Sequence, residues 1–174
     1  MDNIEYYKQN FEDLKNISDD FCSKTVSQCK FTSCDFSSAD LSSSSFEDCL
    51  FENCNLSLAN FENSHLQNMM FKNCKILGVN FTKANQFGLE IGFKDCLIKN
   101  CNFCHMNLNK TKFENCDLSE TDFIGTKLNG ANFQDSKFKQ VAFNNTSLEK
   151  ADFRNASGYS INPFTNNLKK AKFS

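Results

Sequence analysis

The sequence predicts an all-β solenoid, a fold in which short repeated units wind around a common interior. Three observations lead to this class: a large apolar residue at every fifth position, a small residue two positions before it, and polar residues at the other positions. Repetition at a fixed period is the sequence signature of stacked repeat architectures. We therefore expect the 174 residues to form one domain.

The large apolar residues form two unbroken runs, from Phe21 to Phe81 and from Phe93 to Phe153. Each run has thirteen positions, and every position holds Phe, Leu, Ile or Val. On an α-helix, a step of five residues advances by about 140° and would spread these side chains over every face. On a straight strand, odd spacings point to opposite faces. The chain must therefore turn once in every five residues.

A small residue precedes most of the large ones by two positions, as in Cys29, Cys34 and Ala39. Two residues that are two positions apart on an extended segment face the same way, so both point inward. The residue between them points outward and is often Asp or Asn. The last two residues of each unit are polar and suit a corner.

Several of these units resemble the pentapeptide-repeat family. Examples are Cys34-Asp35-Phe36-Ser37-Ser38, Ala39-Asp40-Leu41-Ser42-Ser43, Ala131-Asn132-Phe133-Gln134-Asp135 and Ala151-Asp152-Phe153-Arg154-Asn155. The resemblance covers residues 21–157 and implies a right-handed quadrilateral parallel β-helix with four units per coil and about six to seven coils. The residues alone do not fix four sides. The leucines at 108, 128, 148 and 168 suit a coil of twenty residues, but a ten-residue alternation explains most of the pattern equally well.

The two runs are separated by twelve residues instead of ten, so residues 86–92 contain a two-residue interruption of the repeat. This segment holds two of the six glycines, which permit the unusual backbone angles of an insertion. One interpretation is an evolutionary slip in the coil. The other is a protruding contact loop formed by Gln86, Phe87, Gly88, Leu89 and Glu90.

The two ends of the chain depart from the repeat. Residues 1–20 are predicted to cap the open stack, as solenoids require, although Ile4, Tyr7, Phe11 and Leu14 could also form one face of a short helix. Residues 158–174 are predicted to form an irregular final coil. This block resembles the last coil of family members that protect DNA gyrase, in which a following helix pairs two subunits. A dimer through the C-terminal end is therefore one alternative, although the chain stops at Ser174.

Eight of the ten cysteines lie at the small inward position, where a thiol is a compact apolar filler. They are Cys29, Cys34, Cys49, Cys54, Cys74, Cys96, Cys101 and Cys116. The first thirty residues contain no secretory signal, so we expect reduced thiols and a cytoplasmic location. The spacing Cys101-Asn102-Phe103-Cys104-His105 matches a c-type haem attachment site. The repeat nevertheless places the two cysteines on opposite sides of the wall, so no metal and no cofactor is predicted.

No catalytic constellation is predicted either. The chain has two histidines, His65 at an outward position and His105 at a corner, and neither is placed beside a nucleophile and an orienting group. The sequence also lacks a phosphate-binding glycine loop and an apolar run of membrane length. We therefore expect a protein that is not an enzyme and has no membrane partner.

Charge is distributed unevenly along the chain. Six acidic residues and no Lys or Arg lie between Phe31 and Phe71: Asp35, Asp40, Glu47, Asp48, Glu52 and Glu62. The segment from Lys72 to Lys112 contains seven lysines and only two acidic residues, Glu90 and Asp95. The total charge is −2, which does not favour direct binding of nucleic acid. The rod is therefore predicted to be dipolar along its axis, with the six acids as a candidate partner-binding surface.

A rigid acidic surface can compete for a cationic groove that is built for duplex DNA, whose charges recur about every 1.7 Å. The resemblance to the quinolone-resistance and microcin-immunity members of the family implies such a DNA-mimicking rod. Its partner would be a type II topoisomerase, DNA gyrase or topoisomerase IV, with an effect on quinolone or toxin sensitivity. Two alternatives remain open: an interaction scaffold for an unrelated protein, and a solvated surface whose charges only keep the rod soluble.

Overall fold

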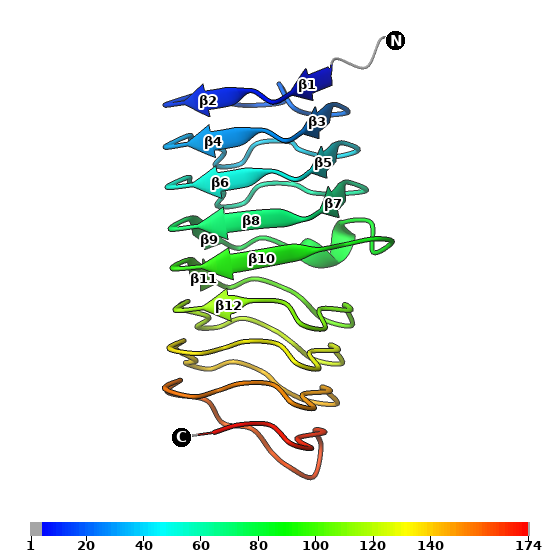
Figure 1. Ribbon diagram of the computed structural model, residues 1–174, viewed down its shortest axis with the longest axis vertical. Coiled ribbons are helices and arrows are strands. Elements are labelled where there is room, and N and C mark those ends of the chain that lie inside the picture. The colour runs from blue at the N-terminus through cyan, green and yellow to red at the C-terminus, as the bar shows by residue number, and fades with distance from the viewer. Residues whose placement is uncertain (1–4, 174) are drawn as a thin grey trace.

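The structure is a computed structural model that describes residues 5–173, and it is a four-sided parallel β-solenoid (Figure 1). Strands pair in parallel with the strand one coil later, at a spacing of twenty residues, as in Val26 with Phe46 and Phe31 with Phe51, except that β8 with β10 and β9 with β11 are 22 residues apart. Because a buried large residue recurs every five residues, a coil of twenty holds four units. The predicted all-β solenoid is confirmed, and the ten-residue alternation is wrong.

The strands fall into three sheets and cover three sides of the rod. The first sheet contains, in order, β1 (Glu5–Tyr7), β3 (Thr25–Ser27), β5 (Ser45–Glu47) and β7 (His65–Gln67). The second contains β2 (Asn10–Glu12), β4 (Lys30–Thr32), β6 (Leu50–Glu52), β8 (Met69–Lys72), β10 (Ile91–Lys94) and β12 (Phe113–Glu114). The third contains β9 (Lys75–Leu77) and β11 (Leu97–Lys99). Beyond β12 the same register continues as single bridges, such as Asn132 with Asp152.

We number the four sides by the large residues that they bury. Face 1 carries the first sheet and continues through Leu108, Leu128 and Leu148; face 2 carries the second sheet and continues through Phe133 and Phe153. Face 3 carries the third sheet and continues through Leu118 and Phe138. Face 4 contains the short 3-10 helix η1 (Phe81–Lys83) and the phenyl rings at 61, 103, 123 and 143.

The predicted interior is confirmed at every repeat position. All 26 large residues of the two runs are buried, with at most 7% exposure. On face 2, nine phenyl rings from Phe11 to Phe173 stack from coil to coil with centroids 4.6–5.4 Å apart. Each offset-stacked pair contributes about 0.5–1.5 kcal/mol beyond the area that it buries. The phenyl column is therefore the main axis of the core.

The corners depend on a backbone conformation that the sequence pattern did not indicate. The residue two positions after each large one of the two runs has a positive φ, such as Ser33 (57°), Ser38 (59°) and Ser43 (56°), with the exception of Lys83 in η1. This left-handed region costs most non-glycine residues about 1–2 kcal/mol. The outward Asp or Asn before the large residue supports the turn, since the carboxylate of Asp40 accepts the Ser42 N–H at 3.0 Å. Outward Asp and Asn are thus structural elements of the corner.

The ladder extends into both segments that were predicted to be irregular. Residues 5–12 form β1 and β2, so the helical alternative for this segment is wrong; its Ile4 lies outside the described residues. Tyr6 and Phe11 pack on Phe21, with ring centroids 5.3 and 5.5 Å away. At the other end, Phe173 stacks on Phe153. Within residues 5–173, no helix is long and apolar enough to cross a membrane.

The cysteines behave as the predicted fillers. The eight inward thiols are buried, and all ten cysteines are free. The thiols also connect the coils: Cys54 Sγ donates to the carbonyls of Phe31 (3.5 Å) and Glu52 (3.4 Å). Burial raises the pKa of Cys49 and of Cys101 to about 11, because desolvation disfavours the thiolate. These thiols are therefore protonated near neutral pH.

Candidate functional site

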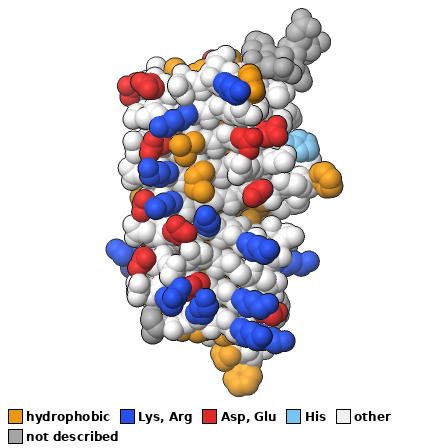
Figure 2. Space-filling view, in the orientation of Figure 1, with side chains coloured by type: hydrophobic (Ala, Val, Ile, Leu, Met, Phe, Trp, Pro, Cys, Tyr) orange, Lys and Arg blue, Asp and Glu red, His pale blue; other side chains and the backbone are white. Residues whose placement is uncertain are grey.

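The structure distributes the six candidate acids around the rod. Glu47 and Asp48 lie on face 1 and its corner and Glu52 on face 2. Asp35 lies on face 3 and Asp40 and Glu62 lie on face 4. They form a band around the N-terminal half and do not share one face. Figure 2 shows one side of the molecule, where acidic side chains mix with basic ones above and Lys and Arg gather toward the C-terminal end.

Two of these acids hold the coil together. Asp35 Oδ1 accepts the Ser37 N–H at 3.0 Å and Asn55 Nδ2 at 3.1 Å. Asp40 has the equivalent bonds to Ser42 and Asn60. These hydrogen bonds, first those from the serines, lower the pKa of both carboxyls. The Oδ1 atom of each carboxylate is thus already occupied.

Glu52 is neutralised by two lysines from the coils on either side. Lys30 Nζ and Lys72 Nζ each lie 2.8 Å from its carboxylate oxygens. Their hydrogen bonds and charge lower the pKa of Glu52 to about 2. The sequence interpretation counted no base near this acid, because a lysine twenty residues away becomes a neighbour only after the coil length is known.

The remaining acids are more available to a partner. Asp48 accepts a hydrogen bond from Asn68 Nδ2 at 2.6 Å, and Glu62 lies 3.8 Å from Lys83 Nζ. The exposed Glu47 side chain makes no hydrogen bond or ion pair with any residue from 5 to 173. Of the six, Glu47 and its neighbour Asp48 therefore offer the freest negative charge, and both lie on face 1.

The two additional residues of the interrupted coil produce a projection from face 1, at the level below β7 (Figure 1). Phe71 of β8 pairs with Phe93 of β10, which is a spacing of 22 residues. Gln86 to Glu90 form this projecting loop. Phe87 is 87% exposed, and the Asn85 carbonyl oxygen Oδ1 accepts its N–H at 2.9 Å. Gly88 has φ 69° and open space around it. The five candidate loop residues are thus brought together around an exposed aromatic ring.

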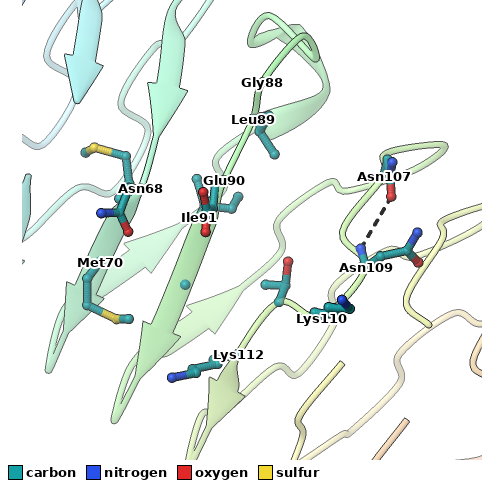
Figure 3. Close-up of a pocket in the computed structure, with 13 residues that line it drawn as sticks. Asn68, Met70, Gly88, Leu89, Glu90, Ile91, Asn107, Asn109, Lys110 and Lys112 are labelled. Carbon is teal, nitrogen blue, oxygen red and sulfur yellow. Dashed lines mark hydrogen bonds between the residues drawn. The ribbon is translucent and has the colours of Figure 1, made fainter. Parts of the chain in front are cut away.

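A cleft of about 500 Å³ lies directly beneath this loop (Figure 3). Its lining includes Asn68 and Glu90 on one side and Asn107, Asn109, Lys110 and Lys112 on the other. Of these residues, the sequence interpretation found only Glu90, as part of the loop. The others occupy ordinary outward and corner positions, and only the displaced loop above them opens the space.

The other sequence motifs do not form chemical sites. Among residues 5–173, no group of three or more His, Cys, Asp or Glu side chains could hold a metal ion. Cys101 is buried in the core while Cys104 lies outside it on face 4, so the haem-like spacing brings no pair of thiols to one side. His65 Nε2 lies 3.2 Å from Asn85 Nδ2, a contact that contains no nucleophile.

A repetitive rod that turns once every five residues defines a class, the β-solenoids built from five-residue units. The pentapeptide-repeat region model matches residues 24–103 and 93–174, which together span most of the chain. The chain therefore belongs to the pentapeptide-repeat family. No curated protein sequence matches it.

Two solved structures are similar to this chain. A trypsin-treated variant of QnrB1, a plasmid-mediated fluoroquinolone resistance protein, is 21% identical and aligns with a TM-score of 0.50 over 95% of this chain and 91% of that chain. A second treated variant is 20% identical, with a TM-score of 0.49 over 98% and 92%. At 21% identity, the likeness to the first variant shows the fold alone.

Proposed function

We propose that this chain is a binding protein that contacts its partner through the projecting loop, with a type II topoisomerase as the partner. The observation that carries the proposal is Phe87, an almost fully exposed aromatic ring on a loop that departs from an otherwise uniform rod. Exposed aromatic anchors dominate the energy of protein interfaces. All large residues at the repeat positions of the two runs are buried, whereas Phe87 lies outside these positions and is exposed, so its exposure favours a contact role over a neutral slip.

The choice of partner is supported by the fold of QnrB1, a protein described as conferring fluoroquinolone resistance. Fluoroquinolones act on type II topoisomerases. Glu47 and Asp48, on the same face as the loop, supply the free negative charge that a cationic DNA groove would attract. The loop and these two acids together are the proposed contact surface.

A supercoiling assay with DNA gyrase, ciprofloxacin and increasing amounts of this protein tests the proposal. We expect the protein to inhibit the enzyme or to relieve the drug at micromolar concentration. Phe87→Ala should lower the potency at least tenfold. The matched control is Phe164→Ala, since Phe164 is 95% exposed at the far end of the rod and should change the potency less than twofold.

A wild-type protein with no effect on gyrase or topoisomerase IV would remove the topoisomerase from the proposal. Equal potency of Phe87→Ala and Phe164→Ala would mean that the loop is not part of the contact surface. The double variant Glu47→Lys with Asp48→Lys then tests whether the negative charge contributes to binding. Unchanged potency would mean that the DNA-like charge is not used.

The second candidate function is a scaffold for an unrelated protein. It is favoured by the band-like distribution of the acids and by the two lysines that neutralise Glu52, since neither feature provides a continuous acidic stripe. Replacing Phe87 by a photo-crosslinking phenylalanine analogue, in cells that carry the protein, would identify this partner. Crosslinks to a topoisomerase would eliminate the second candidate.

A further inference from the structure

The lower lip of the cleft is an unused edge of the backbone ladder, which turns a corner at Asn109 and Lys110. It consists of the backbone N–H and C=O of Asn107, the C=O of Asn109 and the N–H of Lys112, and we call these four groups the open edge. In the next coil, the equivalent groups belong to Lys127, Asn129 and Asn132. All four of those groups are hydrogen bonded to the coil above, at distances of 2.8–3.0 Å. The open edge makes no such bond with any residue from 5 to 173.

The displaced loop explains why this edge is unused. The Ala84 carbonyl would accept the Asn107 N–H in a regular coil, but it accepts Gln86 Nε2 at 2.8 Å instead. β10 pairs with β8 through all four of its residues, whereas it pairs with β12 only through Phe93 and Lys94. Ile91 and Gly92 therefore have no strand-pairing partner in the coil below, which is the side of the cleft. The ladder is open from face 1 to the beginning of face 2.

The space in front of the open edge is large enough for a bound segment. Its volume of about 500 Å³ lies within the range of about 300–1,000 Å³ that is common for ligand sites. Figure 3 shows Leu89 and Glu90 on the loop side and Asn107, Asn109 and Lys110 on the other. The cleft therefore offers hydrogen-bonding amides together with an apolar loop side chain.

Two lysines give the cleft a net positive lining. Lys110 and Lys112 both line it, and neither forms an ion pair with any residue from 5 to 173. Glu90 is the single acid in the lining. The lysines near Glu52 are different, because both of them already form ion pairs with that carboxylate. A ligand with a carboxylate would supply the missing charge.

We propose that this cleft binds a peptide segment of a partner protein, which follows the open edge around its corner as the next coil does and carries an acidic side chain toward Lys110 and Lys112. Strand addition to an exposed edge is a recurring mode of peptide recognition, in which main-chain hydrogen bonds give affinity and side-chain contacts give specificity. The inference rests on the proposed function as a binding protein, but not on the identity of the partner. The regular coils show the geometry that the bound peptide would need. In each of them, the backbone of one coil forms the hydrogen bonds that the peptide would form with the open edge.

The test is a selection of eight-residue peptides from a randomised phage-displayed library on the whole protein, followed by titration of the best synthetic peptide. Amide chemical shifts of the isotope-labelled protein locate the peptide. We expect enrichment of Asp or Glu and saturable shifts at the Asn107 and Lys112 amides. Lys110→Glu with Lys112→Glu should weaken binding at least tenfold, whereas the matched variant Lys127→Glu on the same side should change it less than twofold.

A second variant removes the cleft without altering charge. Deleting Gln86 and Gly88 leaves the unit Ala84-Asn85-Phe87-Leu89-Glu90, which has the form of a regular repeat and restores the twenty-residue spacing. We call this deletion the closed variant. It should lose peptide binding entirely. Retained binding by the closed variant would overturn the proposal, as would shifts that map elsewhere or a library without enrichment.

Shifts of the same amides that depend on protein concentration without peptide would mean that a second copy fills the cleft, and they would also overturn it. The result is separable from the proposed function. Phe87→Ala tests the loop and leaves the open edge in place, while the Lys110 and Lys112 exchange alters the cleft and leaves the loop in place. A failure of the topoisomerase assay therefore does not decide the peptide experiment.

Discussion

The coil from Lys72 to Phe93 has 22 residues, whereas the coil from Glu114 to Phe133 has twenty. The two coils have the same kind of interior, with stacked phenyl rings on face 2 at 5.2 and 5.1 Å from the ring above. They differ in that the regular coil closes its backbone ladder on both sides, while the interrupted coil releases a loop and leaves an edge open. The comparison teaches that two extra residues can change the surface of a solenoid without changing its core.

The largest expected effect comes from replacing one phenylalanine in the core and one on the loop by alanine. Phe103 is fully buried between Phe81 and Phe123, so Phe103→Ala should lower the free energy of unfolding by about 3–5 kcal/mol. Phe87→Ala should change it by less than about 0.5 kcal/mol, because the ring is exposed. Urea denaturation of both variants measures the difference. Similar losses of unfolding free energy would contradict the account that the loop is independent of the core.

The closed variant tests whether the interruption lowers stability. It lets the four open groups regain their hydrogen bonds, each contributing about 0.5–1.5 kcal/mol, and it returns Phe87 to an inward position. Glu90 would occupy the corner, where Glu120 already adopts φ 60°. We expect the free energy of unfolding to rise by about 2 kcal/mol. A less stable closed variant would mean that the loop supports the coil.

The corners provide a smaller effect. Ser38→Gly should raise the free energy of unfolding by about 1 kcal/mol, because glycine removes the steric cost of φ 59°. The neighbouring Ser37→Gly should lower it by about 0.5–1 kcal/mol, since Ser37 lies outside the left-handed position. Thermal unfolding of the two variants would show opposite shifts if the corner assignment is correct, and shifts of the same sign would refute it.

The smallest effect concerns Glu52 and its dependence on pH. Its pKa falls from an ordinary value of 4.5 to about 2 in the folded protein, so its ion pairs stabilise the fold above about pH 4.5. That contribution is lost as the pH falls from 4.5 through 2. Glu52→Gln should therefore melt at a lower temperature than the wild type near pH 7 and at the same temperature near pH 1, below both pKa values. A constant difference across this range would contradict the assignment.

The sequence was sufficient for the fold because each repeat encodes the same local structure. Large residues at every fifth position, with Cys, Ala or Ser two positions earlier, specify the interior independently of the rest of the chain. Glu52 shows where this reasoning ends. Its lysine partners are 22 residues before it and twenty residues after it, so their contact depends on the coil length, which the residues alone left open.

The cleft was hidden for a related reason. The spacing between Phe81 and Phe93 located the interruption, and Gly88 indicated a loop, but no residue pattern marks a missing hydrogen bond. Asn107 and Lys112 resemble Asn132 and Lys127 in the printed sequence. Only the structure shows that the segment above them has moved away. Sequence reasoning therefore located the loop but not the backbone edge beneath it.

Hydrogen exchange of individual amides tests most directly whether the ladder opens only beneath the loop. Asn107 and Lys112 occupy the same positions in their coil as Lys127 and Asn132 in the next. Because only the second pair is hydrogen bonded, we expect Lys127 and Asn132 to exchange at least a hundredfold more slowly than Asn107 and Lys112. Equal protection of the two pairs would contradict the open edge and the peptide site proposed on it.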